Sequence, residues 1–214
     1  MSEAAERILR TGRPSGLIDL RDALKAVYAE RGMKDDGAIT TINDLCRLPL
    51  FQPELDPKAF FSRSWIIRLT QDIADLVRVT IVTLITDALD RYLNSQPDSA
   101  TDADGNRVLR VICVIDEAHR ILGSKLPGLS ALIRLSRSKG GAVMLISQSP
   151  DDFAGEDDDF LSEMGFVAAF ATNGNPGAVR RILGPGANLA VLEKGQAWTK
   201  LRGEASARRI VAWR

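Results

Sequence analysis

Two adjacent carboxylates, Asp116 and Glu117, follow directly after an apolar run from Leu109 to Ile115. A continuous apolar run of this kind is typical of a parallel strand buried on both faces, and parallel sheets bind their ligands at the carboxyl ends of the strands. An acid at a strand end can hold Mg²⁺ through its water shell, and a second acid can orient a water molecule against a phosphate. We therefore predict that Asp116 binds Mg²⁺ and that Glu117 activates water. In the simpler alternative, Asp116 caps the next helix and Glu117 lies in its first turn.

The elements around these acids are predicted to alternate between strands and helices. Buried strands are expected at 109–115, 142–147 and 165–171, and helices at 117–122, 129–137 and 176–183. A turn at Pro127-Gly128 precedes the second of these helices, and two short strands at 196–201 and 208–211 close the chain. Alternation of this kind favours an α/β fold with a mostly parallel sheet.

The first part of the chain is predicted to be helical or irregular. Leu17, Leu20, Leu24 and Val27 recur at helical spacing, which indicates an amphipathic helix over 17–31 that ends at Gly32. The elements expected next are a short helix near 41–47, a buried strand at 64–69, a long helix at 71–94 and a polar loop at 95–106. We accordingly expect an N-terminal helical segment, 1–63, and a core, 64–214, with a basic C-terminal extension.

Three stretches resemble consecutive motifs of one ATPase superfamily. The segment VICVIDEAHRIL is similar to a Walker B strand, LIRLSRSKGG to the helix that follows it, and AVMLISQSP to the next strand, which ends in a polar sensor residue. This order resembles the HerA/FtsK superfamily of additional-strand P-loop ATPases, from Walker B onward. The resemblance implies an incomplete RecA-like three-layer fold with ATP and Mg²⁺ as cofactors. It also implies that Asp116 is the Mg²⁺ acid, Glu117 the water activator and Gln148 the γ-phosphate sensor.

The resemblance further implies a motor that acts on DNA. Proteins of this superfamily are ATP-driven translocases or helicases that work as rings, so the expected partners are DNA and ATPase subunits in a ring, expected to be a hexamer. The stretches SQSPDDF, GAVRRILG and ARRIVAW are most similar to HerA-type ATPases of bacterial DNA-defence systems, such as those of phosphorothioation-dependent restriction. Restriction or defence proteins are therefore further expected partners.

The phosphate-binding loop of the superfamily has no counterpart in this sequence. That loop, GxxxxGK[ST], holds the β- and γ-phosphates through backbone amides and its lysine, whereas these 214 residues contain no Gly-Lys pair. The chain could be a fragment, one half of a split ATPase, or a degenerate subunit that does not hydrolyse ATP. We favour the fragment, because the acidic pair and Gln148 are all present, and we expect this chain alone to hold nucleotide poorly.

Arginines on the predicted helix after Walker B are candidates for action on a neighbouring subunit. Arg134 and Arg137 lie one helical turn apart and therefore share a face, and an arginine supplied in trans can stabilise transition-state charge. Arg180 and Arg181 are further candidates. The basic C-terminal segment could contact a phosphate backbone or a neighbouring nucleotide site. In both cases a solvated surface is the simpler alternative.

Composition restricts the remaining function classes. One histidine and two cysteines exclude a zinc site of the usual ligand spacing. Acidic and basic residues are equal in number (28 each), so net charge does not indicate whether the chain binds nucleic acid or a membrane. The N-terminus lacks an apolar signal region, and the longest apolar stretch, Val79 to Ile85, is too short to span a bilayer, so we expect a cytoplasmic protein without membrane contact.

His119 is expected to pack beneath the helix after Walker B. A module that assembles on a complete ATPase and lends arginines in trans is the alternative function; a nuclease is disfavoured because strand-end acids are few.

Overall fold

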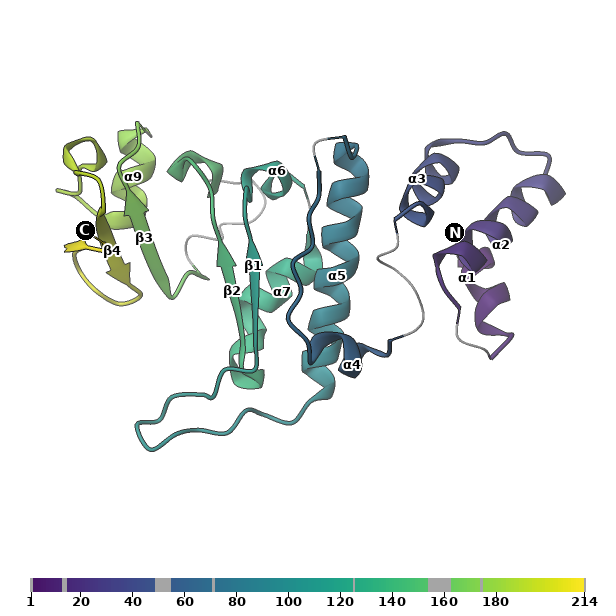
Figure 1. Ribbon diagram of the computed structural model, residues 1–214, viewed down its shortest axis with the longest axis horizontal. Helices are drawn as coiled ribbons and strands as arrows, with labels where there is room; N and C mark the ends of the chain where they lie inside the picture. Colours follow the sequence, from purple (N-terminus) through teal and green to yellow (C-terminus); the bar gives the residue numbers. More distant parts are fainter. Residues whose placement is uncertain are drawn as a thin grey trace. The chain divides into compact units, whose positions relative to one another are not determined.

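The computed structural model describes residues 2–12, 15–48, 55–70, 72–124, 126–153, 163–173 and 175–213 (Figure 1). The chain divides into two compact units, Met1–Ile85 and Thr86–Arg214. Helix α5 (Asp75–Ser95) belongs to both, because its first half contributes to one unit and its second half to the other. The predicted boundary between an N-terminal segment, 1–63, and a core, 64–214, stays a prediction. Among the described residues, no helix combines the length and the apolar character that crossing a membrane requires.

The first unit is helical, as predicted. Helices α1 (Ser2–Leu9), α2 (Leu17–Glu30) and α3 (Gly37–Cys46), purple in Figure 1, bury a shared apolar cluster. Leu24 and Ile39 lie at its centre and are almost fully inaccessible to solvent. The Asp36 side chain accepts hydrogen bonds from two backbone amides of α3, and this cap starts the helix four residues before the predicted position.

The predicted strand at 64–69 is wrong, because these residues pair with no strand in the described parts of the chain. They follow the short helix α4 (Pro57–Phe61) in an extended course, and Ile66 is 91% exposed. Trp65 instead stacks on Phe60, with ring centroids 4.9 Å apart, and its indole donates to the Phe60 carbonyl at 2.7 Å. Local aromatic packing therefore replaces the ladder that the apolar pattern suggested.

Helix α5 begins later than predicted because a buried arginine holds the chain before it in a turn. The guanidinium of Arg78 donates to the carbonyls of Thr70 and Ile73 and also contacts Asp75. The Thr70 carbonyl also accepts the Ile73 amide at 3.2 Å, which closes a turn immediately before the helix. The helix therefore starts at Asp75, and its first turns pack Val77 and Ile81 against Leu45.

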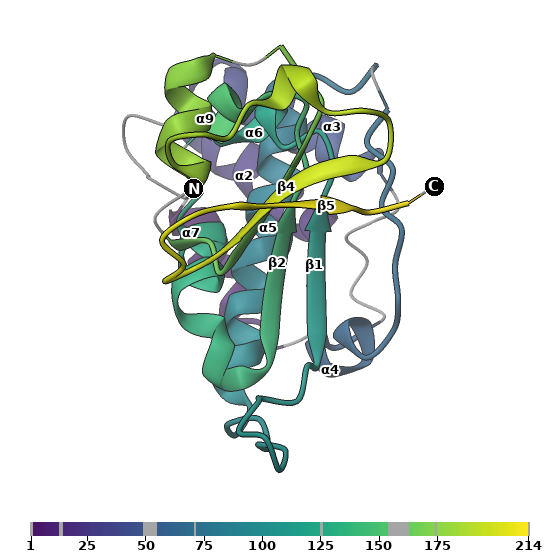
Figure 2. The ribbon, with the colours of Figure 1, turned by 90° about the vertical axis from the view of Figure 1, so that its left-hand side faces the viewer.

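A parallel pair of strands forms the centre of the second unit. Strand β1 (Val111–Ile115) pairs with β2 (Gly141–Leu145) in the register Val111↔Gly141 to Ile115↔Leu145. Their connection comprises α6 (His119–Leu122), α7 (Pro127–Leu135) and the 3₁₀ turn η1 (Ser136–Lys139). Helices α5 and α7 cover one face of the pair, as Figure 2 shows.

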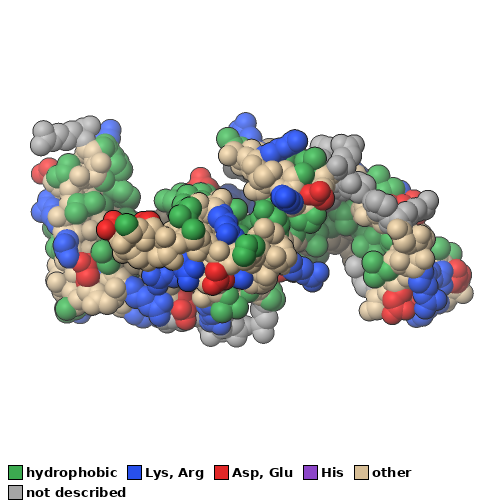
Figure 3. Space-filling view, turned by 90° about the horizontal axis from the view of Figure 1, so that it is seen from below, with side chains coloured by type: hydrophobic (Ala, Val, Ile, Leu, Met, Phe, Trp, Pro, Cys, Tyr) green, Lys and Arg blue, Asp and Glu red, His purple; other side chains and the backbone are tan. Residues whose placement is uncertain are grey.

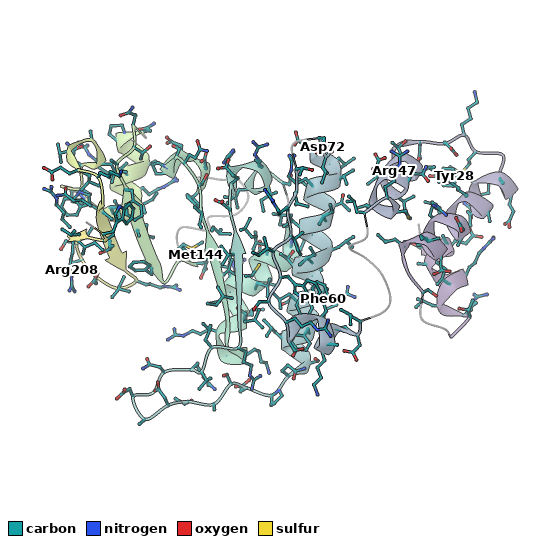
Figure 4. The ribbon with its side chains drawn as sticks, in the orientation of Figure 1. Tyr28, Arg47, Phe60, Asp72, Met144 and Arg208 are labelled. Carbon is teal, nitrogen blue, oxygen red and sulfur yellow. The ribbon has the colours of Figure 1, made fainter. Side chains whose placement is uncertain are left out.

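The opposite face of the parallel pair is open, which corrects the expectation that these strands are buried on both sides. Ile112 and Val114 on β1 are each 54% exposed, and Met144 on β2, labelled in Figure 4, is 53% exposed. The alternating burial along β1 is the pattern of a sheet covered on one face only. Cys113 points to the covered side, where burial raises the pKa of its thiol.

The third predicted strand belongs to a separate antiparallel sheet. Strand β3 (Phe166–Phe170) pairs with β4 (Gln196–Leu201), which pairs with β5 (Arg208–Val211), and both pairings are antiparallel. The last two strands have the predicted bounds. Helix α9 (Pro176–Leu183) and the turn η3 (Leu189–Val191) lead from β3 to β4, and Val179 and Leu183 pack against this sheet.

The α/β class is thus confirmed, with a small parallel sheet, whereas the expectation of a mostly parallel sheet is not met among the described strands. The parallel pair has a long helical crossover, as parallel strands require. Strand β4 instead runs opposite to β3, and the short turn after Leu201 then returns the chain antiparallel as β5. Periodicity shows that a strand is buried, but it does not show the direction of its neighbour.

Candidate functional site

The two predicted strand-end motifs meet at the carboxyl edge of the parallel pair. Past the last paired residues, the Ile146 amide donates to the Ile115 carbonyl at 2.9 Å, and the Ala118 amide donates to the Ile146 carbonyl at 2.8 Å. These two bonds continue the pairing beyond the strands and bring Asp116 and Glu117 alongside Ser147 and Gln148. The site is therefore built by backbone hydrogen bonding of adjacent strands.

Glu117 has a backbone conformation that is rare for a residue with a side chain. Its φ is +54°, and it is the one described non-glycine residue with positive φ. Such a conformation costs about 1–3 kcal/mol and persists only where its surroundings impose it. Here the Glu117 amide donates to Asp116 Oδ1 at 2.9 Å, and the Ala118 amide donates to the carbonyl of Ile146, directly after β2.

The helix after β1 starts at His119, two residues later than predicted, with Ala118 at the N-cap. Asp116 does not cap this helix, and Glu117 does not lie in its first turn, so the simpler alternative for the acidic pair is not what the structure contains. Because Glu117 has a left-handed backbone conformation, the chain changes direction between the end of β1 and the start of α6. The acids therefore occupy the turn itself, at the edge of the sheet.

The Glu117 carboxylate contacts three side chains. Gln148 Nε2 donates to Oε1 at 2.9 Å across 31 residues of sequence. On the other oxygen, Oε2, His119 Nε2 lies at 3.6 Å and Arg120 Nε at 3.9 Å. The structure thus brings together Asp116, Glu117 and Gln148 as the sequence predicted, while their catalytic roles stay predictions.

His119 is exposed at this edge and is not packed beneath the helix as expected. Its Nδ1 lies 3.3 Å from Ser147 Oγ, and the same hydroxyl donates to Asp152 Oδ2. Asp152 lies in the 3₁₀ turn η2 (Pro150–Phe153) and also accepts the Ser149 amide at 3.1 Å. Sequence reasoning missed Ser147, Asp152 and Arg120; the polar residues of SQSPDD, directly after the sensor strand, were the signal for the first two.

Residues that follow β3 form hydrogen bonds with residues that follow β2, next to the Glu117 cluster. Thr172 Oγ1 donates to the Gln148 carbonyl at 3.2 Å, and the Asn175 amide donates to Asp151 Oδ2 at 3.1 Å. The chain that leaves β3 is therefore held to the chain that leaves β2, although these two strands belong to different sheets. Asp151 and Asp152 both accept backbone hydrogen bonds here, and residues 154–162, which follow them, lie outside the described residues.

The candidate arginines lie at the other end of β2. Arg134 is at the end of α7 and faces Glu163 at 3.9 Å, and Arg137 is exposed in η1. Both precede β2, whereas Gln148 follows it, and a five-residue strand separates its ends by about 13 Å. These arginines are therefore not part of the Glu117 cluster of their own chain. Arg180 and Arg181 are exposed on α9.

Basic side chains of the C-terminal hairpin have acidic or polar neighbours. Arg202 faces Glu163 at 3.6 Å, Arg208, labelled in Figure 4, pairs with Glu204, and Arg209 contacts Gln196. The face shown in Figure 3 likewise has Lys and Arg interspersed with Asp and Glu. The expected contact of this extension with a phosphate backbone stays a prediction.

The donor set of the site suits Mg²⁺ held together with a nucleotide. No group of three or more His, Cys, Asp or Glu side chains that could share a metal ion occurs in the described parts of the chain. A site with one acid does not form a protein cage, but Mg²⁺ is commonly bound by one or two carboxylates together with phosphate oxygens and water. Asp116, exposed at the strand end, meets that requirement.

The sequence matches no protein-family model and no curated protein. Among solved structures, the chain is similar to the genome packaging NTPase of Sulfolobus turreted icosahedral virus 2, determined in complex with AMP. The TM-score is 0.43 and the sequence identity 12%, and the match covers 64% of this chain and 63% of that chain. The matched region thus spans less than two thirds of the viral protein.

Proposed function

We propose that this chain supplies the catalytic edge of an ATP-driven motor of the HerA/FtsK type. The observation that carries the proposal is the hydrogen bond from Gln148 Nε2 to Glu117 Oε1 between the ends of two adjacent parallel strands. An acid that activates water must be held at a fixed angle to the phosphate, and a second strand end is a rigid support for it. The motif resemblance of the sequence supports the same function independently.

Each side chain of the edge has a distinct task in this proposal. Asp116 holds Mg²⁺, which when bound neutralises phosphate charge. Glu117 orients a water molecule through one carboxylate oxygen. Gln148 fixes that carboxylate and presents its amide to the phosphate side of the site. Because this chain contains no GxxxxGK[ST] motif, the phosphate grip comes from a segment or subunit outside these residues.

The proposed motor acts on DNA as a ring, with a role in DNA processing or defence. Its expected partners are DNA, a subunit or segment that carries the phosphate loop, and restriction or defence proteins. Arg134 or Arg137, at the end of β2 remote from Glu117, would then reach the nucleotide of a neighbouring subunit. The separation of these arginines from their own chain's acids fits action in trans.

The proposal is tested by combining this chain with a segment or subunit that carries GxxxxGK[ST]. Phosphate release from ATP by this combination is measured with and without DNA. We expect Mg²⁺-dependent hydrolysis that DNA stimulates, and a loss of about 10²–10⁴-fold in Glu117→Gln, because the amide cannot accept a proton from water. Nucleotide binding by this variant should be retained. Glu193→Gln, the same change at an exposed glutamate outside the cluster, should retain wild-type turnover.

Wild-type turnover in Glu117→Gln would remove the assigned role of this residue. Retained hydrolysis after Asp116→Asn would likewise contradict the magnesium-binding role, since the amide is a far weaker Mg²⁺ ligand than a carboxylate.

The alternative, an assembly module that lends arginines in trans to a complete ATPase, has one specific observation in its favour. The exposed Arg137 side chain makes no hydrogen bond or ion pair with the described residues, so none of these residues competes for its five donors. In this case Arg137→Ala would lower the partner's hydrolysis while Glu117→Gln would not. Arg91→Ala, at an exposed position on α5, is the matched control.

A further inference from the structure

A series of polar side-chain contacts that ends at Glu117 Oε2 has no part in the function proposed above. It leads from Asp152 through Ser147 to His119, and from there to Glu117 Oε2. The first and last residues of this series lie in different segments: Asp152 belongs to the turn after β2, and Glu117 to the turn after β1. The contacts therefore connect the two turns that form the edge of the sheet.

The direction of these hydrogen bonds follows from counting hydrogens. A serine hydroxyl has one hydrogen, and an ionised carboxylate can only accept. The hydroxyl of Ser147 thus gives its hydrogen to Asp152, and its oxygen is left to accept from the imidazole. It follows that Nδ1 of His119 is the nitrogen that carries a hydrogen toward Ser147. This ring orientation leaves Nε2 facing Glu117.

We propose that His119 is a positioning residue, held through Nδ1–H by the Ser147–Asp152 pair so that its ring, with Nε2 3.6 Å from Glu117 Oε2, occupies the space into which that carboxylate would rotate. The catalytic meaning of this role rests on the proposed function, whereas the hydrogen-bonded arrangement does not. Gln148 constrains one carboxylate oxygen and His119, beside Arg120, constrains the other. Together they fix the rotation of the carboxylate, which a single contact would leave free. The turn after β2 thereby sets the orientation of an acid in the turn after β1.

Histidine NMR tests this arrangement directly, because His119 is the only histidine of the chain and its ring signals need no assignment among several. The ¹⁵N shifts and two-bond ¹H–¹⁵N couplings of the 214-residue chain show which ring nitrogen carries hydrogen. The ring ¹⁵N shifts themselves identify the neutral imidazole, and the couplings are compared in that form. We expect hydrogen on Nδ1. A neutral ring with a bare Nδ1 would overturn the proposal.

Variants separate the proposed contacts from a general effect on folding. In Ser147→Ala and Asp152→Ala, Nδ1 loses its fixed acceptor, and the hydrogen should move to Nε2, where Glu117 can accept it. Ser147→Thr keeps the hydroxyl and should keep the wild-type signature. Asp151→Ala is the matched control, since this neighbouring acid bonds Ser149 and Asn175 and does not contact Ser147. A shift of the hydrogen in Asp151→Ala, or none in Ser147→Ala, contradicts the assignment.

Turnover measurements then test whether the arrangement positions Glu117. In this chain combined with a GxxxxGK[ST]-bearing segment, Ser147→Ala should lower kcat for ATP hydrolysis about tenfold or more. KM should change little, because only the orientation of the proposed water-activating acid, Glu117, is altered. Ser147→Thr should restore kcat. Unchanged kcat in Ser147→Ala, with the NMR signature altered, would overturn the positioning role. Absence of any wild-type hydrolysis would instead count against the proposed function, and the NMR result would still decide the hydrogen-bonded arrangement.

Discussion

The left-handed conformation of Glu117 makes a prediction that does not depend on nucleotide chemistry. Glycine adopts positive φ without a steric penalty, whereas alanine retains the clash between Cβ and the backbone. Glu117→Gly and Glu117→Ala delete the same contacts to Gln148, His119 and Arg120. The difference in stability between these two variants therefore isolates the cost of the +54° backbone angle.

The magnitude follows from two opposing effects. The left-handed conformation costs a residue with a Cβ about 1–2 kcal/mol, and the larger entropy of glycine in the unfolded chain costs about 0.5–1 kcal/mol. The Glu117→Gly variant should consequently unfold with a free energy about 0.5–1 kcal/mol higher than that of Glu117→Ala. In a protein of this size the difference corresponds to a Tm shift of about 1–4 °C.

Urea denaturation followed by circular dichroism measures this difference, provided both variants unfold with the same m-value. The control pair is Arg91→Gly and Arg91→Ala, at an exposed position inside α5, where the order should reverse because glycine is about 1 kcal/mol worse than alanine in a helix. If Glu117→Ala proves as stable as Glu117→Gly, the left-handed turn does not exist in solution, and the description of the acids as part of a turn is refuted.

Two further predictions concern the core of the second unit. A Cβ on Gly128 would lie 2.0 Å from Asp87 Oδ1 and 2.7 Å from the Asp87 amide, so Gly128→Ala should destabilise the protein by about 1–3 kcal/mol in urea denaturation, whereas Gly123→Ala, whose Cβ meets no atom within 4 Å, should not. Because burial raises the pKa of Cys113, less thiolate is present at pH 8, and mass spectrometry should detect slower alkylation of Cys113 in the folded protein than in 8 M urea; equal rates in both conditions would contradict the burial of this thiol.

The helices and the closing hairpin could be predicted because their signals are local. The spacing of Leu17, Leu20 and Leu24 is enough to specify α2, and Asn175 before Pro176 is a helix start with a capping side chain. Strand β4 follows Gly195, and a polar turn that contains Gly203 separates it from β5, so these limits are readable in sequence. Such features depend on residues within a few positions of one another.

Features that depend on distant partners could not be predicted in the same way. The stretch 64–69 has strand-like composition, yet a strand exists only if another strand accepts its hydrogen bonds. The apolar run in β1 suggested burial on both faces, but Ile112 and Val114 point to an uncovered face. The start of α5 depended on Arg78, whose buried contacts to Thr70 and Ile73 no periodicity reveals.

The candidate site divides along the same line. The sequence placed Asp116, Glu117 and Gln148 at strand ends, and parallel pairing of those strands is sufficient to bring them together. The left-handed angle of Glu117 gave no signal, because that conformation is ordinarily marked by glycine or asparagine. The contact between Ser147 and His119 also depends on how far each turn projects beyond its strand, which only three-dimensional structure supplies.

These observations connect the strain at Glu117 with its possible chemistry. A right-handed continuation from β1 would carry Glu117 into the first turn of a helix and give its carboxylate to solvent. The left-handed turn instead keeps the carboxylate at the strand edge, within reach of Gln148 at 2.9 Å and His119 at 3.6 Å. Both contacts come from groups whose own positions are set by β2 or by the turn that follows it. The unusual backbone angle thus places the acid where these side-chain contacts restrict its orientation, which is the arrangement that the proposed activation of a single water molecule requires.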